Sequence, residues 1–252
     1  MGIRKQAGFT IIEVMLFLAV TGMLTVAILV GSGISISQQR YRDSVNTLKS
    51  LIQEQYSEAA NVSNDRGNDA SCANAVIAQP PDPVPNPQPR GTSDCVIMGR
   101  LFTVGDNGID LTISNVVGYR TSTTAPAEAT DLLELQKNYK IAASPIDTEQ
   151  NQVEWGAKIV KPKTTTLEPL SIMIIRSPLS GSIMTFVGDG VAGGANGLNT
   201  LAAAGLNTSA RNICLDAEVG TFVGKRQAIR INALASSASA IEIPSESEGV
   251  CD

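Results

Sequence analysis

The fold is decided by residues 8–36, which read GFTIIEVMLFLAVTGMLTVAILVGSGISI. No charged residue occurs from position 14 to position 39, and most side chains in this run are apolar. A helix over residues 9–36 would be roughly 40 Å long, whereas about 20 apolar residues suffice to cross a bilayer. The stretch therefore predicts a single membrane-spanning helix near the N-terminus.

Charges on either side of this helix indicate its orientation. Arg4 and Lys5 precede it and favour a cytoplasmic N-terminus, and Arg40 and Arg42 follow it and weaken that bias without reversing it. The apolar run is too long for an ordinary secretory signal, and no small-residue cleavage site follows it. A cleavage site fits better before the apolar core, at Gly8, where a small residue lets a protease approach the backbone closely.

Glu13 is a lone carboxylate inside this apolar segment. A charge near the bilayer interior is costly, so it needs a partner, a proton or a function. One interpretation is a plain signal anchor, in which the glutamate lies near the helix N-terminus because the macrodipole favours it there. The other is that cleavage after Gly8 frees an amine on Phe9, and that Glu13 meets such an amine from a neighbouring chain.

The stretch GFTIIEVM, after a short basic leader, resembles the class III signal of type IV pilins and type II secretion pseudopilins. The resemblance implies that residues 1–8 are a leader peptide and that a prepilin peptidase cuts after Gly8. It also implies that the same enzyme methylates the new N-terminus at Phe9, and that Glu13 is the glutamate used in assembly. In that role the ion pair sets the register, while packing of apolar helices supplies most of the association.

One position departs from the family pattern. Many pilins have a proline near position 30 that lets the helix melt in the filament, whereas this chain has Val30 between Leu29 and Gly31. Glycine costs about 1 kcal/mol relative to alanine inside a helix. We therefore expect Gly31 and Gly33 to allow the local melting.

Beyond the membrane segment, apolar residues recur at spacings of three and four, which predicts that the helix continues with one buried stripe. The predicted organisation is a leader at 1–8, a helix at 9–60 with its membrane part at 9–36, a proline-rich loop at 61–100 and a β-rich head at 101–252. The fold class is α+β: a long helical spine packed on a mostly antiparallel β head. The stripe comprises Tyr41, Val45, Leu48, Ile52, Tyr56 and Ala59.

Short segments rich in β-branched residues, several of them separated by turn signals, predict the strands of the head. The glycine-rich run at 188–207 is expected to be a loop with one helical turn, and residues 130–140 a short helix or a strand. The expected strands are 96–104, 109–119, 153–160, 169–177, 182–188, 211–218, 227–234 and 240–243.

The four cysteines are Cys72, Cys95, Cys214 and Cys251. An even number of cysteines beyond a membrane segment indicates disulfides formed outside the cytoplasm. Of the three possible pairings we favour the sequence-local one, Cys72 with Cys95 and Cys214 with Cys251. Free buried thiols are the alternative. The first bridge would close a loop in which six of the twelve prolines lie between positions 80 and 89.

Composition argues against several functional classes. The formal net charge is -5, histidine is absent and aromatic residues make up 4% of the chain. An acidic chain without aromatic platforms is a poor candidate for nucleic-acid binding. The lack of histidine removes the commonest catalytic base and metal ligand, so we expect no enzyme activity, cofactor or metal site. The turn DNGID at 106–110 lacks the spacing of a calcium loop and predicts a hairpin instead.

The function implied by the resemblance is that of a structural subunit of a type IV pilus or pseudopilus. The implied partners are other pilin subunits, the prepilin peptidase, the inner-membrane assembly platform, and membrane lipid before assembly. The precursor would span the membrane once, and the mature subunit would lie in an extracellular pilus or a periplasmic pseudopilus. The unusual proline loop and long head favour a minor subunit. The alternative is an uncleaved, membrane-anchored extracellular binding domain.

A second, looser resemblance concerns residues 223–243, VGKRQAIRINALASSASAIEI. They resemble the closing strands of H-type minor pseudopilins and of their pilus counterparts, in which an arginine-bearing strand precedes a final hairpin. The resemblance implies that the head ends in antiparallel strands.

Overall fold

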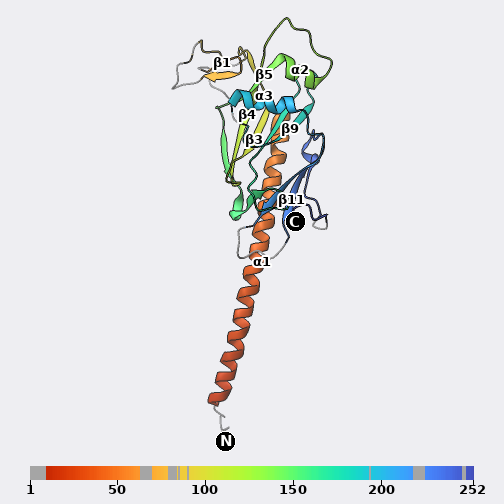
Figure 1. Ribbon diagram of the computed structural model, residues 1–252. Helices are drawn as coiled ribbons and strands as arrows, with labels where there is room; N and C mark the ends of the chain where they lie inside the picture. The colour runs from red at the N-terminus through yellow and green to blue at the C-terminus, as the bar shows by residue number, and fades with distance from the viewer. Residues whose placement is uncertain are drawn as a thin grey trace, which may run out of the picture.

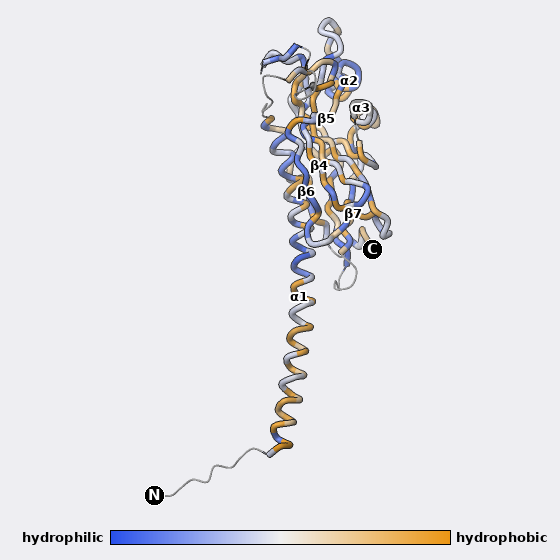
Figure 2. Tube along the Cα trace, turned by 90° about the vertical axis from the view of Figure 1, so that its left-hand side faces the viewer, coloured by the Kyte–Doolittle hydropathy of each residue, from blue (hydrophilic) through white to orange (hydrophobic). Residues whose placement is uncertain are grey.

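The computed structural model describes residues 10–62, 70–78, 84, 86–89, 91–192, 194–217, 225–245 and 248–252. One long helix, α1 (Ile11–Ala60), extends from the N-terminal end into a β-rich head, and its first half projects from that head (Figure 1). Figure 2 shows that the projecting half is mostly hydrophobic and that the hydrophilic residues of α1 begin where the head does. The α+β architecture predicted from the sequence is therefore confirmed.

The second half of α1 packs on the head along one stripe. All six residues of the predicted stripe are buried, from Tyr41 at 4% exposed to Ala59 at 0%. They join a core cluster with apolar residues of both large sheets. The helix ends at Ala60, where Asn61 caps it by donating its backbone N–H to the Ser57 carbonyl at 3.0 Å. The buried stripe is what fixes the spine to the head.

The larger sheet has six antiparallel strands in the order β5-β4-β3-β8-β9, with β6 also paired to β4. In β8, Ile172 and Ile174 face α1, while Met173 and Ile175 face the opposite side. The sheet is thus buried on both faces, and β8 accordingly has a continuous apolar run from Ile172 to Ile175. The strands are β3 (Cys95–Val104), β4 (Asp110–Arg120), β5 (Tyr139–Ala143), β6 (Glu149–Gln152), β8 (Leu170–Arg176) and β9 (Ile183–Asp189).

Two helices, α2 (Asp131–Asn138) and α3 (Gly194–Ala204), cover the face of this sheet that points away from α1 (Figure 1). The expectation of a loop with one turn was wrong for α3, which has 11 residues. Leu198 and Leu201 of α3 are buried against the sheet, so tertiary packing outweighs the low helix propensity of its glycines. Residues 130–140, expected to form either a short helix or a strand, contain both, since α2 leads directly into β5.

The smaller sheet has four antiparallel strands in the order β12-β11-β10-β7. Residues 153–160 were expected to form one strand, but a 3₁₀ turn, η1 (Glu154–Gly156), precedes the three-residue β7. The strand is broken because Trp155 and Gly156 both have positive φ, at 57° and 73°. The remaining elements are β7 (Lys158–Val160), β10 (Arg211–Asp216), β11 (Gln227–Ile231), η2 (Ala238–Ala240) and β12 (Ile241–Glu242).

The segment assigned to a proline-rich loop also contains regular structure. A small hairpin, β1 (Ser71–Ala73) with β2 (Val76–Ala78), lies at its start, and β3 begins at Cys95 within its expected bounds. The expected boundary at residue 100 therefore falls inside a strand. The DNGID turn connects β3 to β4, as the hairpin prediction required.

Candidate assembly site

The first turn of α1 holds Glu13 in a capping box. Thr10 is the N-cap, and its Oγ1 accepts the backbone N–H of Glu13 at 3.3 Å. In return, the Glu13 carboxylate accepts the backbone N–H of Thr10 at 3.3 Å. This arrangement satisfies two N–H groups that the helix itself leaves without partners. The predicted processing site at Gly8 and Phe9 lies outside the described residues.

The projecting half of α1 presents apolar side chains to its surroundings. Ile11, Ile12 and Met23 are 83%, 76% and 77% exposed, and the other large apolar side chains up to Ile36 are also exposed, the least of them Ile34 at 39%. The most apolar window of the helix is long enough to cross a membrane, and none of it is buried in the head. An apolar surface of this length is not stable in water, so it must be covered by lipid or by other helices.

Two threonine side chains in this half form hydrogen bonds within the helix. The Thr21 hydroxyl donates to the Phe17 carbonyl at 2.8 Å, and the Thr25 hydroxyl donates to the Thr21 carbonyl at 2.8 Å. These bonds to the preceding turn give both threonine hydroxyls an acceptor within the helix, which lowers the cost of placing them in hydrocarbon. Glu13 is thus the chemically exceptional group on a surface that is otherwise compatible with a bilayer.

Residues 3–29 match the family model described as the prokaryotic N-terminal methylation motif. The chain carries the class III signal of type IV pilins and pseudopilins. This signal implies association with other pilin subunits and processing by a prepilin peptidase, and together with the apolar helix it fits a membrane-anchored precursor. No curated protein and no solved structure matches the chain.

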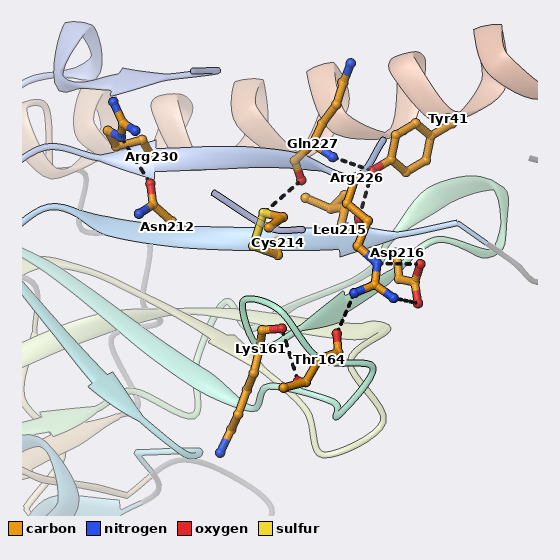
Figure 3. Close-up of a disulfide and its surroundings, with 11 residues drawn as sticks. Tyr41, Lys161, Thr164, Asn212, Cys214, Leu215, Asp216, Arg226, Gln227 and Arg230 are labelled. Atoms are coloured by element: carbon orange, nitrogen blue, oxygen red, sulfur yellow. Dashed lines mark hydrogen bonds and ion pairs between the residues drawn. A yellow bond between two sulfur atoms is a disulfide. The ribbon is translucent and has the colours of Figure 1, made fainter. Parts of the chain in front are cut away.

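The pilin-type helix is tied to its head by Tyr41, close to the point where the head begins. The buried Tyr41 hydroxyl donates to the Leu215 carbonyl at 2.7 Å and accepts the Gln227 N–H at 2.8 Å (Figure 3). It therefore bridges the ends of β10 and β11. Burial raises the pKa of Tyr41 to about 12, although the hydrogen bond from Gln227 acts in the opposite direction.

A buried arginine makes the second tie, near the other end of the head. The Arg100 guanidinium donates to the Gln55 side chain at 3.0 Å and to Asn115 at 2.9 Å. It also forms ion pairs with Glu58 at 2.8 Å and Glu149 at 2.5 Å. Burial raises the pKa of Glu58 while the adjacent Arg100 counteracts the shift. This network of hydrogen bonds and ion pairs joins α1 to strands β3, β4 and β6.

The disulfides are Cys72–Cys95 and Cys214–Cys251, with Cα–Cα distances of 5.8 Å and 5.6 Å. They are the sequence-local pairs. The first links the β1–β2 hairpin to the start of β3, and the second links β10 to the C-terminal residues. Figure 3 shows the second beneath the Tyr41 contacts, beside the ion pair of Arg226 with Asp216 at 3.0 Å.

The structure confirms both predicted disulfide pairs, whereas the assembly role of Glu13 stays a prediction. The sequence did not reveal Tyr41 and Arg100 as polar ties. Tyr41 was assigned to the apolar stripe, and nothing in the local pattern reveals what its hydroxyl contacts. Arg100, inside an apolar strand, is a visible irregularity that could have been read as a buried polar network. Among the described residues, no group of three or more His, Cys, Asp or Glu side chains is arranged to hold a metal ion.

Proposed function

We propose that this chain is a structural subunit of a type IV pilus or pseudopilus, and not an enzyme. The prepilin peptidase cleaves it after Gly8 and methylates Phe9, and the assembly platform of the inner membrane then inserts it into the growing filament. The observation that carries the proposal is the methylation motif at residues 3–29 on a helix whose apolar half is exposed. Apolar helices of neighbouring copies cover that surface in the filament.

Glu13 acts in this proposal as the partner of the methylated amine of a neighbouring Phe9. Methylation leaves the amine positively charged, so a charge-assisted bond to a carboxylate remains available. The neighbouring positions are apolar and hold no competing ion, as far as the described part of the segment extends. The bond offsets the burial of both charges and fixes the axial position of one helix against the next.

The mature N-terminus tests the proposal. We expect mass spectrometry of the chain from its native host to show a protein that begins at Phe9 and carries a methyl group. Gly8→Val should block cleavage, because a branched side chain keeps the protease from the backbone. Gly2→Val, in the same leader, is the matched control and should be processed normally. A chain that retains residues 1–8 would instead support the uncleaved, membrane-anchored binding domain.

We further propose that the subunit is a minor one, close to the filament tip. Support comes from the size of the head and from the proline-rich, disulfide-closed segment that precedes β3. Immunogold labelling of filaments tests this position. Gold at the tips is expected, whereas labelling along the whole shaft would identify a major subunit.

A further inference from the structure

The feature that carries this inference is an exposed tryptophan beside the point where α1 leaves the head. Trp155 in η1 is 56% exposed, and the Arg40 guanidinium lies 5.0 Å from the centroid of its ring. A second contact holds η1 to the helix, since the Thr47 hydroxyl donates to the Glu154 carboxylate at 3.4 Å. β7, which follows η1 directly, lies at the end of the head from which α1 projects (Figure 2).

The backbone at this position is unfavourable. Trp155 has φ of 57° and ψ of 28°, a left-handed conformation that bulky residues rarely adopt. Such a conformation costs on the order of 1–3 kcal/mol, and residues that adopt it cluster at functional sites. The turn holds a large aromatic ring at the surface when a buried position would be more stable. The exposed ring is therefore available for a contact outside the isolated head.

The length of the helix places this ring at a defined depth. The charge-free run at 14–39 spans about 39 Å as a helix. The hydrocarbon core of a bilayer is about 30 Å thick, or about 40–45 Å with both headgroup layers. With Glu13 at one interface, Arg40 at the other end of the run therefore lies among the headgroups. Trp155, which contacts Arg40, lies in the same layer.

We propose that Trp155 and Arg40 form a contact between the head and the phospholipid headgroups of the membrane that holds the unassembled subunit. Tryptophan prefers this layer because its ring is apolar and its indole N–H seeks a polar partner. The Arg40 guanidinium stacks on the ring and offers donors to lipid phosphate. The contact rests on the membrane-anchored precursor proposed above, and it is lost when the subunit leaves the bilayer for the filament.

The chain offers a direct measurement, because Trp155 is its only tryptophan. The full-length protein is reconstituted into vesicles of phosphatidylethanolamine and phosphatidylglycerol, with acyl chains brominated either near the headgroup or near the terminal methyl. We expect a blue-shifted emission and a larger loss of fluorescence with the shallow bromines than with the deep ones. Aqueous iodide should quench the emission weakly.

A relocated reporter is the control. Trp155→Phe combined with Val96→Trp moves the tryptophan to the start of β3, where Val96 is 51% exposed. This strand start is bridged by Cys72–Cys95 to β1, which lies at the end of the head away from the projecting helix (Figure 1). Its fluorescence should be quenched by iodide and unaffected by either brominated lipid. In the protein that keeps Trp155, Arg40→Gln should reduce the quenching of tryptophan fluorescence by bromines near the headgroup.

Three results would overturn the inference. If the protein floats with the vesicles and Trp155 is quenched by iodide alone, the lipid contact is wrong while the anchored precursor stands. If Trp155 is protected only in assembled filaments, the ring contacts another copy of the chain and not lipid. If the protein does not float with the vesicles, both the contact and the membrane anchor of the proposed function are wrong.

Discussion

Glu13 serves two purposes that the structure allows to be separated. In the single chain its carboxylate completes a capping box with Thr10, which a glutamine performs equally well. In the proposed filament the same carboxylate must carry a negative charge to pair with an amine. Helix capping is local and requires no charge on the side chain, whereas pairing with an amine requires an ionised carboxylate. Substitutions at one residue can therefore distinguish helix capping from subunit pairing.

Glu13→Gln keeps the cap and removes the charge. We expect this variant to be processed and inserted like the native chain, but to enter filaments as poorly as Glu13→Ala. Thr10→Ala is the complementary control, because it removes the capping hydroxyl and leaves the charge. Quantifying mature subunit in sheared filament fractions against the membrane pool measures the effect. Native-level assembly of Glu13→Gln would show that the charge has no part in it.

Tyr41 gives a prediction with a definite pH window. Removing its hydroxyl in Tyr41→Phe leaves the Leu215 carbonyl and the Gln227 N–H without their partner, which should cost about 1–3 kcal/mol near neutral pH. The folded tyrosine ionises only at about 12, whereas the unfolded one ionises near 10. Above pH 10 the unfolded state therefore gains stability by losing a proton that the folded state keeps.

The stability advantage of the native chain over Tyr41→Phe should accordingly shrink between pH 10 and pH 12, by up to about 2–3 kcal/mol. Urea denaturation of both proteins in detergent at a series of pH values measures the difference. Tyr139→Phe, which changes a half-buried tyrosine of β5, controls for loss of a hydroxyl elsewhere. If the free energies of unfolding of the two proteins stayed a constant distance apart from pH 10 to pH 12, the raised pKa of Tyr41 would be contradicted.

At the scale of elements, α1 is one continuous helix with two segments of different character. Up to about residue 36 it is apolar on every side and exposed, and from Tyr41 onward it is amphipathic with one buried stripe. The first half depends on lipid or on other subunits for its stability, and the second depends on the head. The helix is continuous through Gly31 and Gly33, and a Cβ added at either would meet no atom within 4 Å.

Those two glycines are the place where the helix is weakest. Gly31→Ala with Gly33→Ala should stiffen the helix by about 1 kcal/mol per position without any clash in the subunit. If filament assembly requires local melting there, the variant should insert in the membrane normally and assemble less. Gly22→Ala, at an equally open position, is the control. Assembly is measured as sheared filament yield, and equal yields for all three proteins would rule out the melting role.

The six-stranded sheet of the head lies between α1 on one face and α2 and α3 on the other, and the smaller sheet packs in the same core as α1. The two disulfides of the head occupy different places in this arrangement. Cys214 and Cys251 are 0% and 2% exposed and pack with Val160 and Ala228 in the smaller sheet. Cys72 and Cys95 fasten a peripheral hairpin to the start of β3. Loop entropy alone predicts similar contributions from both bridges.

The different surroundings of the two disulfides predict that they contribute unequally to the free energy of unfolding. Replacing Cys214 and Cys251 together with alanine should lower the free energy of unfolding by about 4 kcal/mol, because it loosens a bridge inside the cooperative core. Replacing Cys72 and Cys95 should affect the hairpin and change the main transition less. Urea midpoints of the two double variants in detergent, measured without reductant, test this order. Equal midpoints would show that the hairpin unfolds together with the rest of the head.

The residue pattern alone determined the spine, the register of its buried stripe and most strands of the head. These depend on composition and periodicity over short distances, which the sequence displays directly. Residues 153–160 and the α3 segment were misjudged, because a strained turn and a glycine-rich helix are stabilised by contacts with distant residues. Leu198 and Leu201 form a helix only because a sheet made of other segments covers them.

Only the tertiary structure decided which distant groups meet. Arg100 contacts Gln55 and Glu149, and Trp155 lies over Arg40, although each pair is separated by at least 45 positions in the chain. The local sequence pattern does not predict such contacts, since they arise when two elements pack at a particular angle and depth. The apolar helix could be predicted because one environment acts on all of its residues alike. The polar ties of Tyr41 and Arg100 and the contact of Arg40 with Trp155 each depend on particular distant residues that meet in the fold.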